Sequence, residues 1–205
     1  MKKVSFRNSD MAWDISALIL TPPDFDEAKQ YPTVISVHPF GSCKEQTSSA
    51  TYGKALAEAG YVVIAFDASF QGESGGEPRF VEDPTQRVED VSRVIDYAVT
   101  LPYVDAEKIA GIGVCGGGGY VFNAALTEKR IKAVVGITPV NIGRLFREGF
   151  SMYNPIGALE GMAAQRTAEA RGGERLVNEL LPTSLAEARD NGMTERDVYE
   201  ATEYY

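Results

Sequence analysis

A short glycine-rich segment, Gly113-Val114-Cys115-Gly116-Gly117, places a thiol between a strand-like apolar run and a helix-like segment. A nucleophile at such a turn stands in a strained backbone that only small neighbours permit, and its side chain projects above the end of the strand. The N-terminus of the following helix favours a thiolate and offers a backbone N–H to a developing oxyanion. The pattern predicts that Cys115 is a nucleophile, with room made by Gly113 and Gly117 and an oxyanion donor at the Gly116 N–H.

Two other interpretations of these glycines stay open at this point. Gly111, Gly113 and Gly116 also form the G-x-G-x-x-G pattern of dinucleotide-binding domains. That motif normally opens the first βαβ unit and is followed, about 20 residues on, by an acidic residue. Here several strand candidates precede it, and the next strand ends without a carboxylate, so this interpretation is disfavoured. The remaining alternative is a structural turn that holds a small buried thiol.

The segment Val37-His38-Pro39-Phe40-Gly41 directly follows another apolar run. A histidine followed by small or turn-forming residues at this place matches the loop that supplies a second oxyanion donor. Pro39 has no N–H, so the donor predicted here is Phe40, with Gly41 shaping the loop. His38 is the only histidine in the chain. We interpret it as a brace for this loop rather than as the general base, because the backbone of the loop should face the substrate.

Strand-like and helix-like segments alternate over residues 1–140. The expected strands are 3–7, 14–21, 33–38, 61–67, 108–114 and 131–139, and the expected helices are 48–60, 84–101 and 116–127. Nearly continuous apolar strands between helices indicate an α/β fold with a mostly parallel sheet covered on both faces. From 141 to 205 the chain is rich in Ala, Glu, Arg and Leu and has no strand-like run. We therefore expect a core at 1–140 and a helical cap at 141–205.

Three motifs occur in a characteristic order: His38-Pro39-Phe40-Gly41, then Phe66-Asp67 with Gly72-x-Ser74-Gly75-Gly76, then Gly113-x-Cys115-x-Gly117. Together they resemble the α/β-hydrolase superfamily, and most of all its dienelactone-hydrolase-related and acetyl-xylan-esterase-like branches, over about residues 14–140. The resemblance implies an eight-stranded sheet and hydrolysis of ester, thioester or related acyl bonds, with Cys115 at the nucleophile position. Dienelactone hydrolases also place a glutamate in the first loop, where Glu45 is the nearest residue here. Asp67 is expected to shape the rim of the site.

The superfamily orders its triad along the chain as nucleophile, acid and histidine, yet no histidine follows Cys115. Strands that would carry the acid and the base are not recognisable after residue 140. We expect a complementary C-terminal fragment or chain to complete the sheet and supply both groups, or a second copy of the chain to pair with the open edge. The alternatives are a catalytically inactive binding or partner-dependent protein, a thiol that acts without histidine, and a glutamine-amidotransferase-like cysteine fold.

The composition narrows the class of partner. The 205 residues include 20 basic and 29 acidic side chains, for a net charge of −9, which disfavours nucleic acids and anionic membranes. One histidine and two distant cysteines, Cys43 and Cys115, cannot supply a structural zinc set, and no cofactor is expected. No apolar run of about 18 residues and no signal-peptide pattern is present. A small acyl substrate and a cytoplasmic location are predicted.

Overall fold

The computed structural model describes residues 1–148, 154–176, 182, 184–190, 192, 199 and 202. The chain divides into two compact units, Met1–Phe150 and Ser151–Tyr205. All residues predicted to form the site belong to the first unit. The residue range expected to form the cap, 141–205, includes the last residues of the first unit and all residues of the second. Within that range, residues 149–153 and most of 177–205 lie outside the described residues.

The first unit is built on one sheet of six strands. They are β1 (Lys2–Phe6), β2 (Ile15–Leu20), β3 (Tyr31–Val37), β4 (Val62–Phe66), β5 (Val104–Val114) and β6 (Ile131–Ile137). The strand order is β1-β2-β4-β3-β5-β6. The β1–β2 and β2–β4 pairs are antiparallel, whereas β3, β4, β5 and β6 run parallel to one another. The mostly parallel sheet predicted from the apolar runs is confirmed.

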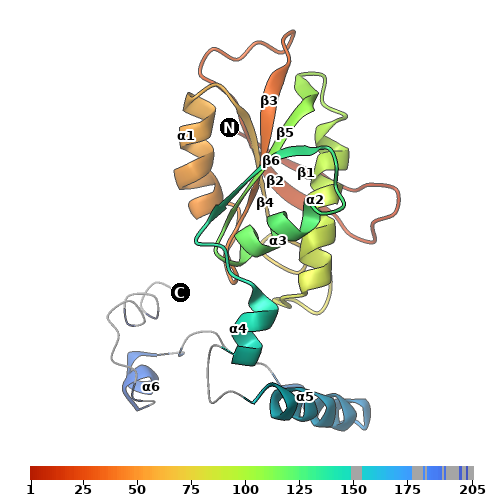
Figure 1. Ribbon diagram of the computed structural model, residues 1–205, viewed down its shortest axis with the longest axis vertical. Helices are drawn as coiled ribbons and strands as arrows, with labels where there is room; N and C mark the ends of the chain where they lie inside the picture. Colours follow the sequence, from red (N-terminus) through yellow and green to blue (C-terminus); the bar gives the residue numbers. More distant parts are fainter. Residues whose placement is uncertain are drawn as a thin grey trace. The chain divides into compact units, whose positions relative to one another are not determined.

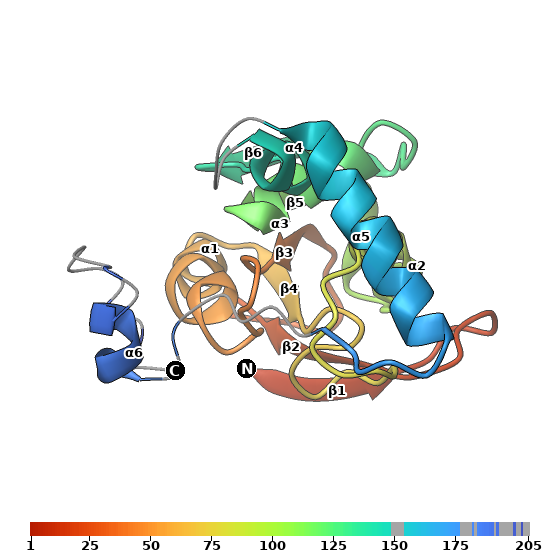
Figure 2. The same cartoon turned by 90° about the horizontal axis from the view of Figure 1, so that it is seen from below.

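Helices cover both faces of this sheet. They are the π-helical turns η1 (Thr47–Gly53), then α1 (Lys54–Glu58), α2 (Pro84–Ala98) and α3 (Gly116–Ala124). A further helix, α4 (Ile142–Glu148), follows β6. Figures 1 and 2 show α1 on one face of the sheet and α2 and α3 on the other. Every residue of β4 is buried, because the apolar side chains of this central strand meet helices on both sides.

The start of α2 follows from its local sequence. Asp83 accepts hydrogen bonds from the backbone N–H groups of Thr85 at 2.9 Å and Gln86 at 3.1 Å. Pro84 occupies the first turn of the helix, where no N–H partner is needed. The buried face of α2 includes Val91, Val94, Ile95 and Ala98, and also Arg87 and Asp90. The helix therefore carries two charged groups into the interior.

Strand β6 forms an edge of the sheet, since β5 is its only partner within the described ranges. No residue of β6 is fully buried, and Val135 is 51% exposed. A Cβ added at Gly136 would lie 2.4 Å from the Phe122 ring of α3. Because side chains alternate along a strand, Val135 faces the opposite side of the sheet. Apolar surface is thus exposed beside this edge, including 45% of Phe122 and 70% of Leu126.

The second unit contains α5 (Pro155–Ala170) and α6 (Leu185–Asp190). Asn154 caps α5 by accepting a hydrogen bond from the Gly157 N–H at 3.0 Å, and Pro155 begins the helix. Both elements are helical, as the composition of this segment predicts. Among the helices of the described ranges, none has the length and apolar character that crossing a membrane requires.

Candidate active site

Cys115 occupies the turn between β5 and α3 with φ 53° and ψ −119°. A positive φ is uncommon for a residue with a side chain and is kept only where surrounding contacts enforce it. Two hydrogen bonds do so here: the Cys115 N–H donates to the Ile137 carbonyl at 2.9 Å, and the Val140 N–H donates to the Cys115 carbonyl at 2.9 Å. The last residue of β6 and the segment that follows it therefore hold the strained turn in place. The Cys115 side chain is partly exposed.

The glycines on either side of Cys115 are required by backbone contacts. A Cβ on Gly113 would lie 2.2 Å from the Gly117 carbonyl oxygen. A Cβ on Gly117 would lie 2.4 Å from the Val37 carbonyl oxygen and 2.5 Å from that of His38. The first turn of α3 thus packs on the backbone of β5 and on the end of β3. The sequence predicts small residues here, and the structure supplies the neighbouring atoms that exclude larger ones.

The loop that follows β3 lies against the start of α3. A Cβ on Gly116 would lie 3.3 Å from the Phe40 backbone nitrogen and 3.4 Å from the Phe40 Cβ. Gly41 has φ 64° and turns the chain away from this contact. Among the described residues, neither the Phe40 N–H nor the Gly116 N–H forms a backbone hydrogen bond outside the regular elements. The two predicted donor segments are therefore neighbours beside Cys115.

His38 is fully buried, and both nitrogens of its ring are engaged. Nδ1 lies 2.7 Å from the Pro39 carbonyl oxygen, to which it donates. Nε2 accepts from the Ala68 N–H at 3.1 Å and from the Arg87 guanidinium at 2.8 Å. Burial and the Arg87 charge lower the pKa of His38 well below its usual value. The ring is neutral and occupied by structural contacts.

Asp67 stands at the end of β4 and is fully buried beside a buried lysine. Its carboxylate accepts from the Lys44 backbone N–H at 2.7 Å, from Lys44 Nζ at 2.7 Å and from the Glu73 N–H at 2.9 Å. Lys44 Nζ also pairs with Glu45 and with Glu73, each at 2.6 Å. Asp67, predicted at the rim of the site, and Glu45, predicted near the first loop, therefore meet through a lysine that the sequence pattern did not indicate.

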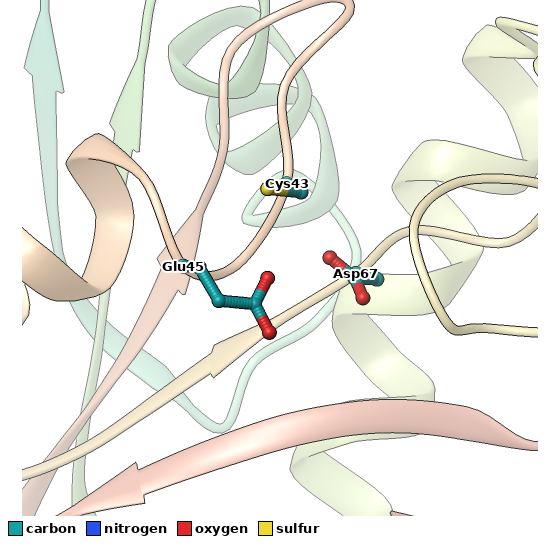
Figure 3. Close-up of side chains that lie close together, drawn as sticks. All are labelled: Cys43, Glu45 and Asp67. Carbon is teal, nitrogen blue, oxygen red and sulfur yellow. The ribbon is translucent and has the colours of Figure 1, made fainter.

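The ligand atoms of Cys43, Glu45 and Asp67 lie within 4.8 Å of one another, which is a spacing that a metal ion could bridge. Figure 3 shows Cys43 and Glu45 on the loop after β3 and Asp67 just beyond the end of the neighbouring strand β4. Both carboxylates already pair with the Lys44 ammonium group. A metal ion would compete with this buried cation, so the donor set fits a lysine counter-ion better than a metal.

The charges of this cluster shift the pKa values of its members. Hydrogen bonds from Lys3 and from Lys44 lower the pKa of Glu73 to about 2. Burial lowers the pKa of Lys44, but its hydrogen bonds to Asp67, Glu45 and Glu73 outweigh burial and raise the pKa overall. Burial raises the pKa of the Cys43 thiol. The lysine is therefore charged, and Cys43 is poorly suited to act as a thiolate.

A cavity of about 760 Å³ lies between the start of α2, α3 and the segment after β6. Its lining includes Tyr120, Phe122, Asn141 and Ile142, whereas Cys115 is not part of it. Ile142 connects the two places, because its Cδ1 would lie 3.2 Å from a Cβ on Gly116. The cavity is thus beside the nucleophile turn and does not contain the thiol.

The strand order, the helices on both faces and a strained residue between β5 and α3 define an α/β-hydrolase fold. The chain belongs to the X-Pro dipeptidyl-peptidase (S15) family, whose sequence profile matches residues 13–201. The superfamily predicted from the motifs is confirmed. Its dienelactone-hydrolase-related and acetyl-xylan-esterase-like branches stay a prediction.

Two bacterial proteins are similar to this chain in sequence. The chain is 46% identical over 208 residues to the uncharacterized protein YcjY of Escherichia coli K12, covering 99% of this chain and 66% of that protein. It is 40% identical over 146 residues to the uncharacterized protein PA2218 of Pseudomonas aeruginosa, covering 69% of this chain and 39% of that protein. The chain therefore spans less than two thirds of the length of either relative.

Solved structures show the same fold. The crystal structure of PA2218 from Pseudomonas aeruginosa superposes with a TM-score of 0.74 at 33% identity, covering 94% of this chain and 63% of that one. The α/β hydrolase GrgF from Penicillium superposes with a TM-score of 0.72 at 19% identity, covering 100% of this chain and 73% of that one. At that lower identity the likeness concerns the fold alone.

The contact between Gly117 and β3 can be tested by substitution. We expect Gly117→Ala to lower the free energy of unfolding by about 1–3 kcal/mol or more, because the new methyl group meets fixed backbone atoms. Gly143→Ala is the matched control, since there the new methyl group meets the flexible end of Arg147 at 3.0 Å and Asn141 Oδ1 at 3.5 Å, and no backbone atom of another element. Urea denaturation followed by circular dichroism measures both. Equal stability of the two variants would contradict the close packing of α3 on β3.

The Lys44 cluster predicts a specific loss of stability in acid. The pKa of Glu73 is lower in the folded protein than its ordinary value of 4.5, so its contribution is present above that value and is lost as pH falls towards about 2. Glu73→Gln should therefore flatten the decline of the free energy of unfolding between these pH values. Glu58→Gln, at the exposed end of α1, should keep the wild-type slope. Identical slopes for Glu73→Gln and wild type would count against the cluster.

Proposed function

We propose that this chain carries the acylation machinery of an acyl hydrolase or acyl transferase, with Cys115 as the nucleophile. The observation that carries the proposal is the strained Cys115 at the junction of β5 and α3, next to the loop after β3. The thiolate adds to the carbonyl carbon of a small acyl substrate, and the carbonyl electrons move to oxygen. Collapse of this intermediate expels the leaving group and leaves an acyl thioester on Cys115.

The negative oxygen of the intermediate is stabilised by the N–H groups of Phe40 and Gly116 in this proposal. Support comes from the closeness of the Gly116 and Phe40 backbones beside the thiol. Each donor of this kind contributes about 2.7–4 kcal/mol to stabilising such a transition state. His38, Gly41, Glu45 and Asp67 act in this proposal only by shaping the loop and the rim of the site.

The general base that completes turnover is a histidine from polypeptide outside these 205 residues, oriented by an acid from the same source. Two observations support this part of the proposal. The chain contains one histidine, and both ring nitrogens of His38 are engaged by other groups. The exposed apolar surface beside β6 offers an edge where further strands would dock. Water activated by that histidine would then release the carboxylic acid and regenerate the thiol.

Esters and thioesters are favoured over amides as substrates for this chain. An amine leaving group must be protonated as it departs, whereas a thiolate or a phenolate leaves without a proton. The names of two relatives point the same way. The chain is 30% identical over 140 residues to the thiohydrolase aneE of Aspergillus aculeatus and 24% identical over 172 residues to the acyltransferase drtE of Aspergillus calidoustus.

A second candidate function is the release of dipeptides from X-Pro peptides, which the family match favours. The same thiol and the same oxyanion donors would serve it. The difference lies in the leaving group, because peptide cleavage depends on a histidine that protonates the departing amine. The two functions are therefore separated by the choice of substrate.

Acylation of Cys115 is directly measurable. We expect p-nitrophenyl acetate to release a burst of one p-nitrophenolate per chain and to add one acetyl group, located on Cys115 by peptide mass spectrometry. Cys115→Ala should abolish the burst, whereas Cys43→Ala should retain it, because the Cys43 thiol is held protonated by burial. A burst that survives in Cys115→Ala would reject Cys115 as the nucleophile, and the absence of a burst from the wild-type chain would leave a non-catalytic binding protein as the alternative.

The substrate class has its own test. The 205-residue chain should be acylated by an acyl thioester at a measurable rate, and it should release no p-nitroaniline from alanyl-prolyl-p-nitroanilide. The physical reason is that no imidazole among the described residues is available to protonate the amine. Cys115→Ala is the background control for both substrates. Cleavage of the anilide by the wild-type chain, absent from that control, would favour the peptidase function.

A further inference from the structure

Arg87 connects α2 to the loop that carries the predicted oxyanion donor. The side chain is 2% exposed. Its Nη2 donates to the His38 carbonyl oxygen at 2.6 Å and lies 3.5 Å from that of Pro39. Its Nη1 lies 2.8 Å from His38 Nε2. One guanidinium group therefore holds both the backbone and the ring of His38.

We propose that Arg87 is a positioning residue that aims the Phe40 N–H at the substrate oxygen; this inference rests on the proposed function. The Pro39 carbonyl and the Phe40 N–H belong to one planar trans peptide group, so they point in opposite directions. The Pro39 carbonyl oxygen points towards the buried side chains of His38 and Arg87. It lies 2.7 Å from His38 Nδ1 and 3.5 Å from Arg87 Nη2. In this proposal the Phe40 N–H consequently points away from His38 and Arg87, to the side on which Gly116 lies.

Arg87 also contacts the helix that carries the second donor. Its guanidinium carbon lies 4.9 Å from the centre of the Tyr120 ring, and Tyr120 belongs to α3. The Tyr120 hydroxyl donates to Glu82 at 2.9 Å, and Glu82 lies 3.4 Å from Arg87 Nε. The arginine thus touches the Phe40 loop on one side and the nucleophile helix on the other. It sets the separation of the two N–H groups on which the oxyanion depends.

A further effect acts on the strength of the donor. A carbonyl that accepts hydrogen bonds polarises its own peptide group, and the attached N–H becomes a stronger donor. The Pro39 carbonyl accepts from the neutral His38 ring, which is itself held by a positive charge. The His38 and Arg87 side chains of this network are buried, so water has little access to the contact between them. Removal of Arg87 therefore affects acyl chemistry in particular.

Two reactions of the same thiol separate a positioning role from general structural damage. Acylation by p-nitrophenyl acetate passes through a tetrahedral oxyanion and uses the N–H donors. Alkylation by iodoacetamide is a direct displacement at carbon, forms no oxyanion and reports only on thiolate reactivity and access. Both rates are measured at Cys115 by peptide mass spectrometry, so that labelling of Cys43 is kept separate. The ratio of the two rates is the readout.

The variants are Arg87→Lys and the double variant Glu82→Gln/Arg87→Met, which removes the buried cation together with its carboxylate partner. Arg93→Met is the matched control, because Arg93 lies on the same helix and pairs near the surface with Asp10 and Glu89. We expect the double variant to acylate about 10–100-fold more slowly and to be alkylated within about twofold of wild type. Arg87→Lys should recover part of the acylation rate, because its ammonium group can still donate to one carbonyl.

Each other outcome has a defined meaning. Unchanged acylation in the Arg87 variants, or equal losses in both reactions, would overturn the positioning role and leave the proposed function intact. Loss of the folded state in every Arg87 variant, seen by circular dichroism, would also overturn it, because the residue would then act through stability. Wild-type protein that is alkylated but not acylated at Cys115 would overturn the proposed function, and the role of Arg87 with it.

Discussion

The close contact between the first turn of α3 and the backbones of β3 and β5 is the constraint on which the rest of the site depends. A Cβ on Gly113 or on Gly117 would lie 2.2–2.4 Å from carbonyl oxygens. At this distance α3 starts directly above the end of the sheet, and Cys115 must adopt a positive φ to connect strand and helix. The same contact brings Gly116 against Phe40. The positions of Cys115 and of the two proposed oxyanion donors are therefore consequences of one packing arrangement.

Two buried cations hold the loop after β3 from different directions. Arg87 reaches it from α2 through His38 and Pro39, and Lys44, which belongs to the loop itself, is bound to Asp67 at the end of β4. Buried charges are costly unless they are paired, and both cations are paired here. The loop contributes backbone groups to the proposed chemistry, so its position has to be specified by neighbouring side chains.

The runs of apolar residues in the sequence predicted the sheet well, because strands that are buried on both faces are apolar throughout. Strand β5 begins at Val104, four residues before the predicted start, because Asp105, Glu107 and Lys108 interrupt the apolar pattern there. Its pairing with β3 is irregular over the same stretch, since Tyr31 pairs with Val104 and Thr33 already pairs with Ile109. Arg87 was missed although a signal existed: it lies on the apolar face of α2, four residues before Val91. Lys44 had no such signal, because its partners Asp67 and Glu73 are distant in the chain.

The sequence by itself determined the glycine-flanked turn at Cys115, the order of the strands along the chain and the superfamily, since each depends on residue types within a few positions of one another. It also established that the chain has one histidine. Only the tertiary structure decided what that histidine does, because its partners Ala68 and Arg87 come from other elements. An open edge was expected from the sequence, but its position at β6 and the apolar surface exposed beside it became visible only once the strands were paired. Strand pairing and side-chain burial depend on residues that are distant in the sequence, so a pattern of neighbouring residues does not predict them.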